Sequence, residues 1–254
     1  MRLPVDHIGY QGPDIEALCR QFTALGFRLL GPVQLSADSG DDEPVQLSAH
    51  IMFADSYIEL TALSGPAPGH RLNRWQQSSP APRLLLLRCA DAAELRERLL
   101  SQGHSVSALM QAQRCLPGEP QRLARFRWFE LLDEPLPGML TGCVEQLTPE
   151  IVFAPAAAGH PNTVHRLTAL YHRAGELPPV LREFAGGSIE LRTDRHAPSA
   201  GSFITGVEVA AASLQTCASQ LQKAAIDFHR DGDALHIGAP AAGGAWLKIR
   251  EQPC

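Results

Sequence analysis

Two residues in the N-terminal part of the chain carry groups that can act together on a small molecule: the imidazole of His7 and the carboxylate of Glu59. His7 lies in an apolar stretch over residues 5–12, and Glu59 lies in another over 57–63. Both stretches are typical of β-strands, in which alternate side chains share a face. An imidazole and a carboxylate are suitable ligands for a first-row divalent metal, and equally suitable as a general acid/base pair. Taken alone, His7 also fits a buried core histidine and Glu59 a surface carboxylate.

The stretch that carries His7 opens a unit that recurs along the chain. Asp14 precedes an amphipathic helix as a capping residue, and Gly26 is typical of the position that ends one. Asp91 and Gly103 frame a second helix with the same spacing. Three further stretches of strand type follow the first helix, so the unit has the order βαβββ. These predicted strands cover residues 27–35, 45–53 and 57–63, with an acidic loop at 37–44.

Three more units can be traced in the remaining sequence. The second has predicted strands at 83–89, 105–112 and 125–132. The third starts at residue 165 and is truncated to a short helix near 179–184 and one strand at 188–193. In the fourth, Ser213 caps the helix, and the predicted strands cover 203–210, 234–238 and 245–250.

The repeats predict an α+β fold in which βαβββ modules pair into curled mixed sheets around a cleft. Their irregular spacing argues against a solenoid. We expect an N-terminal domain of two paired modules in residues 1–140 and a connector in 141–163. A second, partly truncated pair of modules is expected in 164–254. The sequence does not tell whether modules pair within one chain or across a homodimer.

Charge and composition narrow the possible partners to a small molecule. The net charge is −5, from 22 Lys and Arg against 27 Asp and Glu, and no basic run appears, which disfavours nucleic acid. Apolar runs are too short to span a membrane, and a secretory signal is not visible. The six cysteines are scattered without a CxxC pair, which disfavours a structural zinc site and indicates a reducing, cytoplasmic setting.

Three short motifs follow one another along the chain. The first is Asp-His-Ile-Gly at residues 6–9, with Leu-Gly-Phe at 25–27 after the helix. The second is Asp-Ser-Tyr-Ile-Glu-Leu at 55–60, and the third is Leu-Thr-Pro-Glu at 147–150 with His-Pro-Asn at 160–162. In this order they resemble the vicinal oxygen chelate superfamily, and within it the glyoxalase-like domain group. The resemblance covers residues 5–170.

The resemblance implies a cleft between two modules, with metal ligands on the first and last strand of each. His7 and Glu59 match two of these positions, and Glu130 is assigned to the last strand of the second module. One divalent metal (zinc, nickel, manganese or iron) would polarise vicinal substrate oxygens while Glu59 or Glu130 moves a proton, as in a lyase or isomerase. Leu84 stands where the second module should present a ligand. The pattern therefore fits either a three-ligand site or a member that has lost its metal.

Four further residues are predicted to contact the substrate. His50 stands where the glyoxalase-like group tends to have Asn, although an exposed strand histidine explains it equally well. Tyr57 and Trp128 lie in the strands of Glu59 and Glu130. His165 opens the third unit, as His7 opens the first. For His160, near the third motif, we expect a role in the loop.

The sequence leaves three kinds of function open. The first is a glyoxalase-like enzyme. The second is a metal-free protein that binds or sequesters a small molecule, because Leu84, and Leu147 in place of a histidine of the group, suit a dry pocket. The third is an interaction protein with a filled cleft. An extradiol-type dioxygenase would need two histidines and a glutamate in the C-terminal half, and the sequence does not show that set.

Overall fold

The computed structural model describes residues 2–37, 46–133, 136–154, 159–173, 175, 177, 181–182, 185–197 and 202–253. Its first module has the predicted order βαβββ. Asp14 caps the helix, since its side chain accepts hydrogen bonds from the backbone N–H groups of Glu16 and Ala17 at 2.8 and 3.1 Å. The predicted acidic loop lies almost entirely outside the described residues. The elements are β1 (Leu3–Gln11), α1 (Ile15–Ala24), β2 (Leu30–Ala37), β3 (Gln46–Met52) and β4 (Tyr57–Leu63).

The second module repeats this order after a segment that contains the short helix η1 (Asn73–Trp75). Asp91 caps its helix through the backbone N–H groups of Ala93 and Glu94. Two sequence predictions are corrected here. Residues 140–146, predicted to lie mostly in a connector, form the last strand, and Glu130 ends the third strand instead of lying on the last. The elements are β5 (Ala81–Arg88), α2 (Ala92–Ser101), β6 (Met110–Leu116), β7 (Glu119–Glu130) and β8 (Leu140–Gln146).

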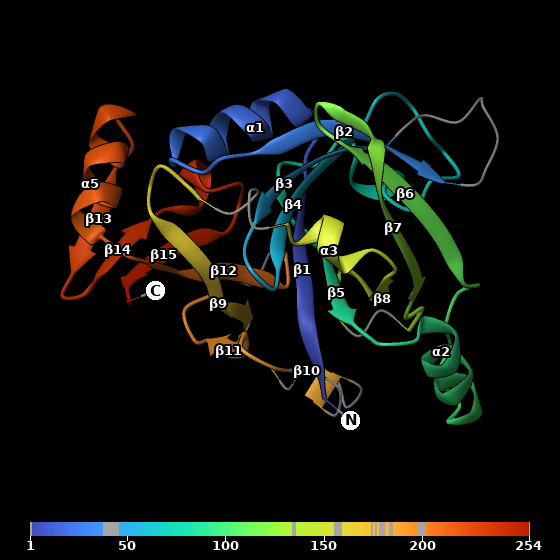
Figure 1. Cartoon of the computed structure of the whole chain (residues 1–254). Helices are drawn as coiled ribbons and strands as arrows, with labels where there is room; N and C mark the ends of the chain where they lie inside the picture. The colour runs from blue at the N-terminus through green and yellow to red at the C-terminus, as the bar shows by residue number, and fades with distance from the viewer. Residues whose placement is uncertain are drawn as a thin grey trace.

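The two modules pair within one chain and close a ring of strands. β1 pairs with β4 in parallel and with β5 antiparallel, and β5 pairs with β8 in parallel. On the other side, β2 pairs with β6 antiparallel. The strand order is β1-β4-β3-β2-β6-β7-β8-β5, and the pairing of β5 with β1 closes it. Figure 1 shows these strands curled round a common interior, with α1 and α2 outside.

The second sheet has the order β11-β9-β12-β15-β14-β13. Its antiparallel β9–β12 and parallel β12–β15 pairs repeat the β1–β5 and β1–β4 pairs. The third module is truncated as predicted, because β11 pairs directly with β9; its predicted helix lies largely outside the described residues. Strand β13 was not predicted. The elements are β9 (Val164–Arg173), β10 (Ala185–Gly186, which pairs with β1), β11 (Glu190–Asp194), β12 (Ile204–Ala211), α5 (Leu214–Lys223), β13 (Phe228–Asp231), β14 (Ala234–Ile237), η3 (Ala239–Ala241) and β15 (Trp246–Glu251).

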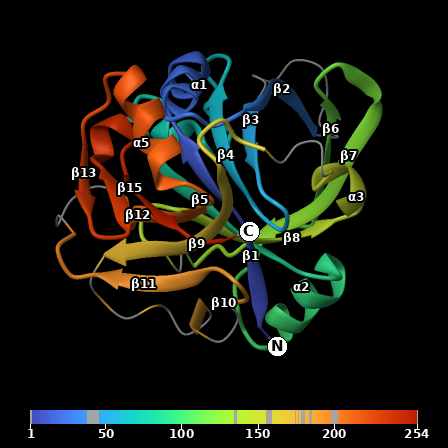
Figure 2. The same ribbon diagram turned by 60° about the vertical axis from the view of Figure 1, so that its left-hand side comes forward.

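A short link around Asn162 joins helix α3 (Pro149–Val152) to β9 and holds the second sheet against the first. The two sheets lie side by side in Figure 2. Asn162 donates its side-chain N–H to the carbonyl oxygen of Leu25 at 2.9 Å, and its backbone N–H to that of Gly26 at 3.1 Å. The link therefore sits on the end of α1. Of the helices in the described ranges, none is long and apolar enough to cross a membrane.

Candidate functional site

A pocket of about 520 Å³, measured out to its open mouth, lies inside the ring of strands. A concave site with apolar walls and a few converging polar groups is typical of small-molecule binding. Its polar and apolar groups are segregated. The polar lining comes mainly from the first module: His7, Gln46, His50, Tyr57 and Glu59, with Arg71 and Arg114 added. The apolar lining comes mainly from the second module: Leu84, Leu86, Phe126, Trp128, Leu140 and Val144, with Leu35 from β2.

His7 and Glu59 face one another in this pocket. In the parallel β1–β4 pair, Tyr57 lies opposite His7 and Glu59 opposite Gly9, so His7 and Glu59 share a face. The distance from His7 Nε2 to Glu59 Oε2 is 3.6 Å. The Tyr57 ring stacks on the imidazole with centroids 4.3 Å apart, which fixes its plane. The adjacency that the sequence predicted for these two strands is confirmed.

Buried neighbours orient both members of this pair. His7 Nδ1 lies 2.7 Å from Asp6 Oδ1, and Asp6 is 0% exposed. Because a carboxylate accepts, Nδ1 donates and Nε2 is left facing Glu59. Ser48 donates its hydroxyl hydrogen to Glu59 Oε1 at 2.6 Å, with Gln46 Nε2 at 3.4 Å. Oε1 is thus engaged, while Oε2 faces the imidazole.

Arg71 reaches the pocket from the segment between the modules. It donates to Gln46 Oε1 at 3.0 Å, and its guanidinium lies 4.2 Å from the ring centroid of Trp128. Its Nε lies 3.8 Å from Glu130 Oε1. Glu130 does not appear in the pocket lining. Its carboxylate pairs with Arg71. Glu130 lies at the end of β7 and not on the last strand of the module, to which it was assigned.

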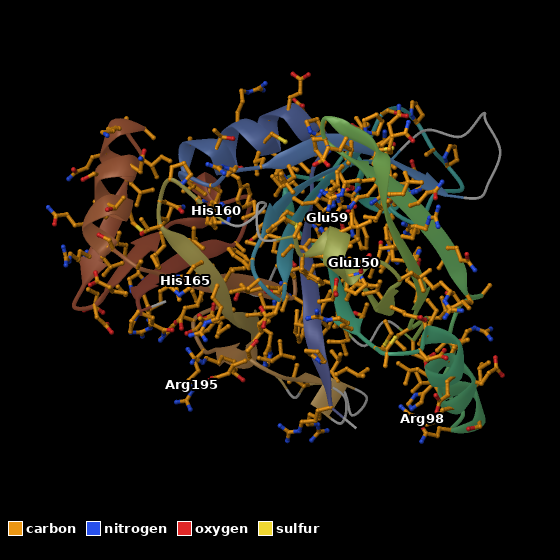
Figure 3. All side chains as sticks on the ribbon, viewed as in Figure 1. Glu59, Arg98, Glu150, His160, His165 and Arg195 are labelled. Atoms are coloured by element: carbon orange, nitrogen blue, oxygen red, sulfur yellow. The ribbon has the colours of Figure 1, made fainter. Side chains whose placement is uncertain are left out.

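The structure brings five of the predicted site residues together and leaves two apart. His7, His50, Tyr57, Glu59 and Trp128 all line the pocket. Glu130 lies outside the lining, and His165 lies on β9 in the other sheet. Figure 3 shows Glu59 among the strands of the first sheet and His165 on the second. His165 therefore lies away from the pocket that the other predicted residues line.

The lining includes residues that the sequence analysis did not single out. Gln46 lies on the same face of β3 as His50, and Ser48, which bonds to Glu59, lies between them; this period of two was a usable signal for Gln46 and Ser48. Arg114 shares its face of β6 with the buried Ala112 and Leu116, where an arginine inside a sheet gave no motif. Arg71 lies in a stretch rich in Pro, Gly and Ser that read only as a linker.

The second module supplies no counterpart of His7 or Glu59. Leu84 holds the position of His7, as predicted. Because Gly142 lies opposite Leu86 as Glu59 lies opposite Gly9, Gly142 holds the position of Glu59. Throughout the described ranges, no three His, Cys, Asp or Glu side chains are grouped so that they could hold a metal ion.

The family model of the glyoxalase-like domain matches residues 5–186 of this chain. No curated protein matches the chain by sequence.

Three solved structures share the fold over nearly the whole chain. A hypothetical protein from Staphylococcus aureus has a TM-score of 0.65 at 9% identity, covering 98% of this chain and 100% of its own. A catechol 2,3-dioxygenase has a TM-score of 0.56 at 13% identity, covering 100% of this chain and 89% of its own. A mutant 4-hydroxymandelate synthase from Streptomyces coelicolor has a TM-score of 0.54 at 12% identity, covering 99% and 93%. With the family model matching both modules that enclose the pocket, the chain belongs to the glyoxalase-like domain family.

Proposed function

We propose that this protein is an enzyme that moves a proton on a small organic molecule held in the pocket, with Glu59 and His7 as the acid/base pair. The observation that carries the proposal is the 3.6 Å approach of His7 Nε2 to Glu59 Oε2 beside an apolar wall. A general base needs a free lone pair facing the reacting atom. Oε2 has one, because Ser48 engages the other oxygen of Glu59. The apolar wall limits competition from water.

In the proposed step, Glu59 Oε2 accepts the proton of a carbon next to a substrate carbonyl. The electron pair of the broken C–H bond moves to the carbonyl oxygen and gives an enolate. Return of the proton to the other face or to another carbon completes an isomerisation. Expulsion of a leaving group from the neighbouring carbon completes an elimination instead. His7, with Nδ1 held by Asp6, exchanges a proton at Nε2 with Glu59 or with the substrate oxygen.

The side chains of the pocket do not fit a resident divalent metal. His7 and Glu59 face one another, but among the described residues no three His, Cys, Asp or Glu side chains are grouped to hold a metal, whereas catalytic metals are commonly held by three protein ligands. Leu84 and Gly142 hold the matching positions of the second module. The guanidinium group of Arg114 adds positive charge to the lining, which opposes a bound cation. The proposed chemistry therefore uses the protein's own groups.

Solvent deuterium exchange tests the proposal. Phenylacetone and 4-oxopentanoate, each with exchangeable hydrogens next to a ketone, are incubated with the protein in D₂O and followed by proton NMR. We expect exchange with the wild type and a rate lower by about 10²–10⁴-fold in Glu59→Gln, which keeps the shape but cannot accept the proton. Glu97→Gln, a change at a carboxylate that is 71% exposed on α2, is the matched control and leaves the rate unchanged.

The alternatives predict different results. Tight binding of either probe without exchange would favour a protein that sequesters its ligand, and Glu59→Gln would then not alter binding. Exchange that appears only with added zinc, nickel, manganese or iron, and disappears in His7→Ala, would contradict the metal-free proposal. That outcome would support the metal-dependent chemistry that the sequence left open.

A further inference from the structure

Three buried polar atoms of lining residues lack a hydrogen-bond partner among the described residues: Nε of Arg71, which lies 3.8 Å from a carboxylate oxygen of Glu130, and Nη1 of Arg114 and Nδ1 of His50, which carry the inference. Arg114 is 4% exposed and His50 is 3% exposed. A buried donor or acceptor left unpaired costs about 1–3 kcal/mol, so native proteins keep few of them. Both side chains line the same pocket, which makes a bound ligand the natural partner of both.

The two atoms require opposite groups on that ligand. The guanidinium of Arg114 can only donate hydrogen bonds. His50 is neutral at neutral pH, because burial, followed by the charges of Arg114 and His7, holds its pKa well below the usual range. A hydrogen bond to the backbone of Leu30 engages its other ring nitrogen. In a neutral imidazole one nitrogen donates and the other accepts, so Nδ1 is the acceptor.

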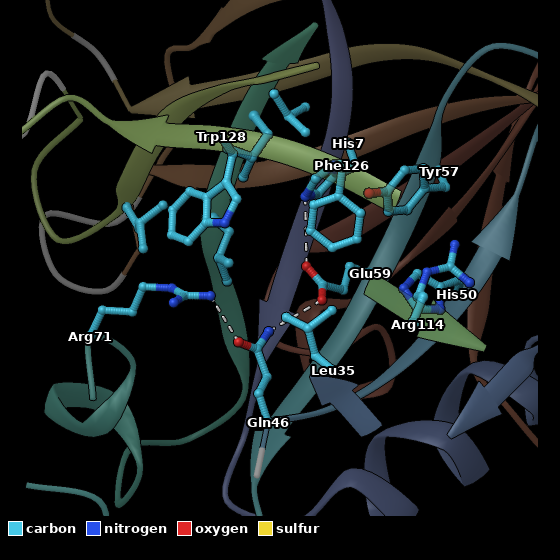
Figure 4. Close-up of a pocket in the computed structure, with 14 residues that line it drawn as sticks. His7, Leu35, Gln46, His50, Tyr57, Glu59, Arg71, Arg114, Phe126 and Trp128 are labelled. Atoms are coloured by element: carbon cyan, nitrogen blue, oxygen red, sulfur yellow. Dashed lines mark hydrogen bonds and ion pairs between the residues drawn. The ribbon is translucent and has the colours of Figure 1, made fainter. Parts of the chain in front are cut away.

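Arg114 is also the guanidinium of the pocket that is available to an anion. Arg71 is engaged by Gln46, Glu130 and the Trp128 ring. Burial lowers the pKa of Arg114, and electrostatic attraction from Tyr57, Glu59 and Asp6 opposes that shift. Figure 4 shows Arg71 and Arg114 on opposite sides of Glu59.

The net charge of the lining favours the same kind of ligand group. The lining contains two guanidinium groups and one carboxylate, that of Glu59. This excess of positive charge favours an anionic ligand group, and a bidentate or single contact to a carboxylate is the usual solution for a buried arginine. The opposite wall is apolar, so the remainder of the ligand is apolar too.

We propose that Arg114 and His50 form a subsite for a carboxylate that carries a hydroxyl group on the adjacent carbon. Arg114 Nη1 donates to the carboxylate, and the hydroxyl donates to His50 Nδ1. The apolar body of this 2-hydroxy acid packs against the wall that Leu84, Leu86 and Trp128 help to form. The inference rests on the proposed function, because it names the end of the substrate that is held while the remainder reaches Glu59.

Calorimetric binding of three matched probes tests the subsite. They are 2-hydroxy-3-phenylpropanoate, its amide, which lacks the charge, and 3-phenylpropanoate, which lacks the hydroxyl. We expect the wild type to bind the hydroxy acid about tenfold or more tightly than either analogue, since each loses one charge-assisted or buried hydrogen bond. Arg114→Gln should lose the preference over the amide. His50→Phe should lose the preference over 3-phenylpropanoate alone.

A matched control and the contrary outcomes complete the test. Arg83→Gln, a change at an arginine that lies over Trp75 outside the pocket lining, should keep both preferences. Equal binding of all three probes by the wild type, no binding of any, or a preference for charge that persists in Arg114→Gln would overturn the subsite. If Arg114→Gln does not fold, the comparison of the three probes on the wild type decides alone.

The subsite and the proton transfer fail in different ways. Glu59→Gln should keep both ligand preferences while it loses deuterium exchange. Intact preferences in a wild type that exchanges nothing would contradict the proton transfer and leave the subsite standing. Intact exchange without any preference for the hydroxy acid would contradict the subsite only.

Discussion

His160 is a single buried side chain that joins three segments. Its Nδ1 accepts the backbone N–H of Arg28 at 3.0 Å, and its Nε2 lies 3.1 Å from the carbonyl oxygen of Met52. One nitrogen accepts and the other donates, so the geometry requires a neutral ring. Burial, opposed in part by the hydrogen bond to Met52, lowers its pKa to about 4. The role of His160 in the loop is thus to hydrogen-bond the loop to Arg28 and Met52 of the first module.

The first prediction concerns the pH dependence of stability. An unfolded histidine titrates near 6.5. Between pH 6.5 and 4, His160 is therefore protonated in the unfolded state and neutral in the folded state. Stability contributed by His160 is present above pH 6.5 and is lost as the pH falls toward 4, by on the order of 3 kcal/mol. Urea unfolding at pH 7 and pH 4.5 measures it. His160→Gln, which can still donate and accept, should show a smaller drop between the two pH values; equal drops would contradict the assignment.

The residues of the candidate site were predictable where a strand pattern carried them. His7, Tyr57 and Glu59 follow from alternation on two strands that the resemblance made neighbours. Glu130 was assigned wrongly because residues 140–146 contain Gly142 and Cys143 and lack a clear strand signal. Only pairing with β5 and β7 makes them a strand. Arg71 could not be foreseen, because its position depends on how a linker folds back over the sheet.

At the scale of single elements, the two framed helices differ in what covers their ends. Gly26 and Gly103 have φ values of +87° and +85°, and each follows the last turn of its helix. A Cβ at Gly26 would lie 2.8 Å from the Cβ of Asn162, whereas a Cβ at Gly103 would have no atom within 4 Å. The two glycines therefore have the same backbone conformation, but Gly26 packs against Asn162 whereas Gly103 faces open space.

The second prediction uses this matched pair. Gly103→Ala should destabilise the protein by about 1–2 kcal/mol, the cost of a left-handed conformation for an L-residue. Gly26→Ala should cost that amount plus the displacement of Asn162, on the order of 1–3 kcal/mol more. Denaturant unfolding of the two variants measures the difference. Equal losses would show that the link does not rest tightly on the end of α1.

The elements themselves were largely predictable from local chemistry. Asp14 and Asp91 as helix caps and alternating apolar residues located both N-terminal modules, because these signals act within a few residues. Strand β13 was missed, since Phe228–Asp231 is mostly polar and exposed and depends on its pairing with β14. Signals that arise only from long-range pairing cannot be read from a local pattern.

At the scale of the whole molecule, the two sheets share buried contacts. A cluster of buried side chains extends from β1 and α1 to β12, α5 and β15. Gly243, after η3, lies so close to the first module that a Cβ there would be 2.8 Å from the Tyr10 ring and 2.9 Å from the Phe22 ring. The sequence predicted two domains that follow one another along the chain. The contacts described here join the two parts, and they therefore affect whether the parts unfold separately.

The third prediction is that they unfold together. Gly243→Ala, at φ +72°, should lower the hydrogen-exchange protection of β3–β4 and of β14–β15 by the same amount, because disturbing Tyr10 and Phe22 weakens a shared core. Gly232→Ala, at φ +56° with no atom within 4 Å of the new Cβ, is the control and should cost about 1–2 kcal/mol at most. Loss of protection confined to the second sheet would instead indicate independent unfolding.

The closed ring of the first sheet also governs how this chain meets other chains. Strands paired on both sides offer no row of free backbone N–H and C=O groups to a neighbour. The described strands of the second sheet end at β11 and β13, and β13 carries exposed His229, Arg230 and Asp231, side chains that oppose the addition of another strand. The half that holds the pocket is thus the half least open to strand exchange. Self-association through backbone pairing would have to begin at β11 or β13, the edge strands of the second sheet.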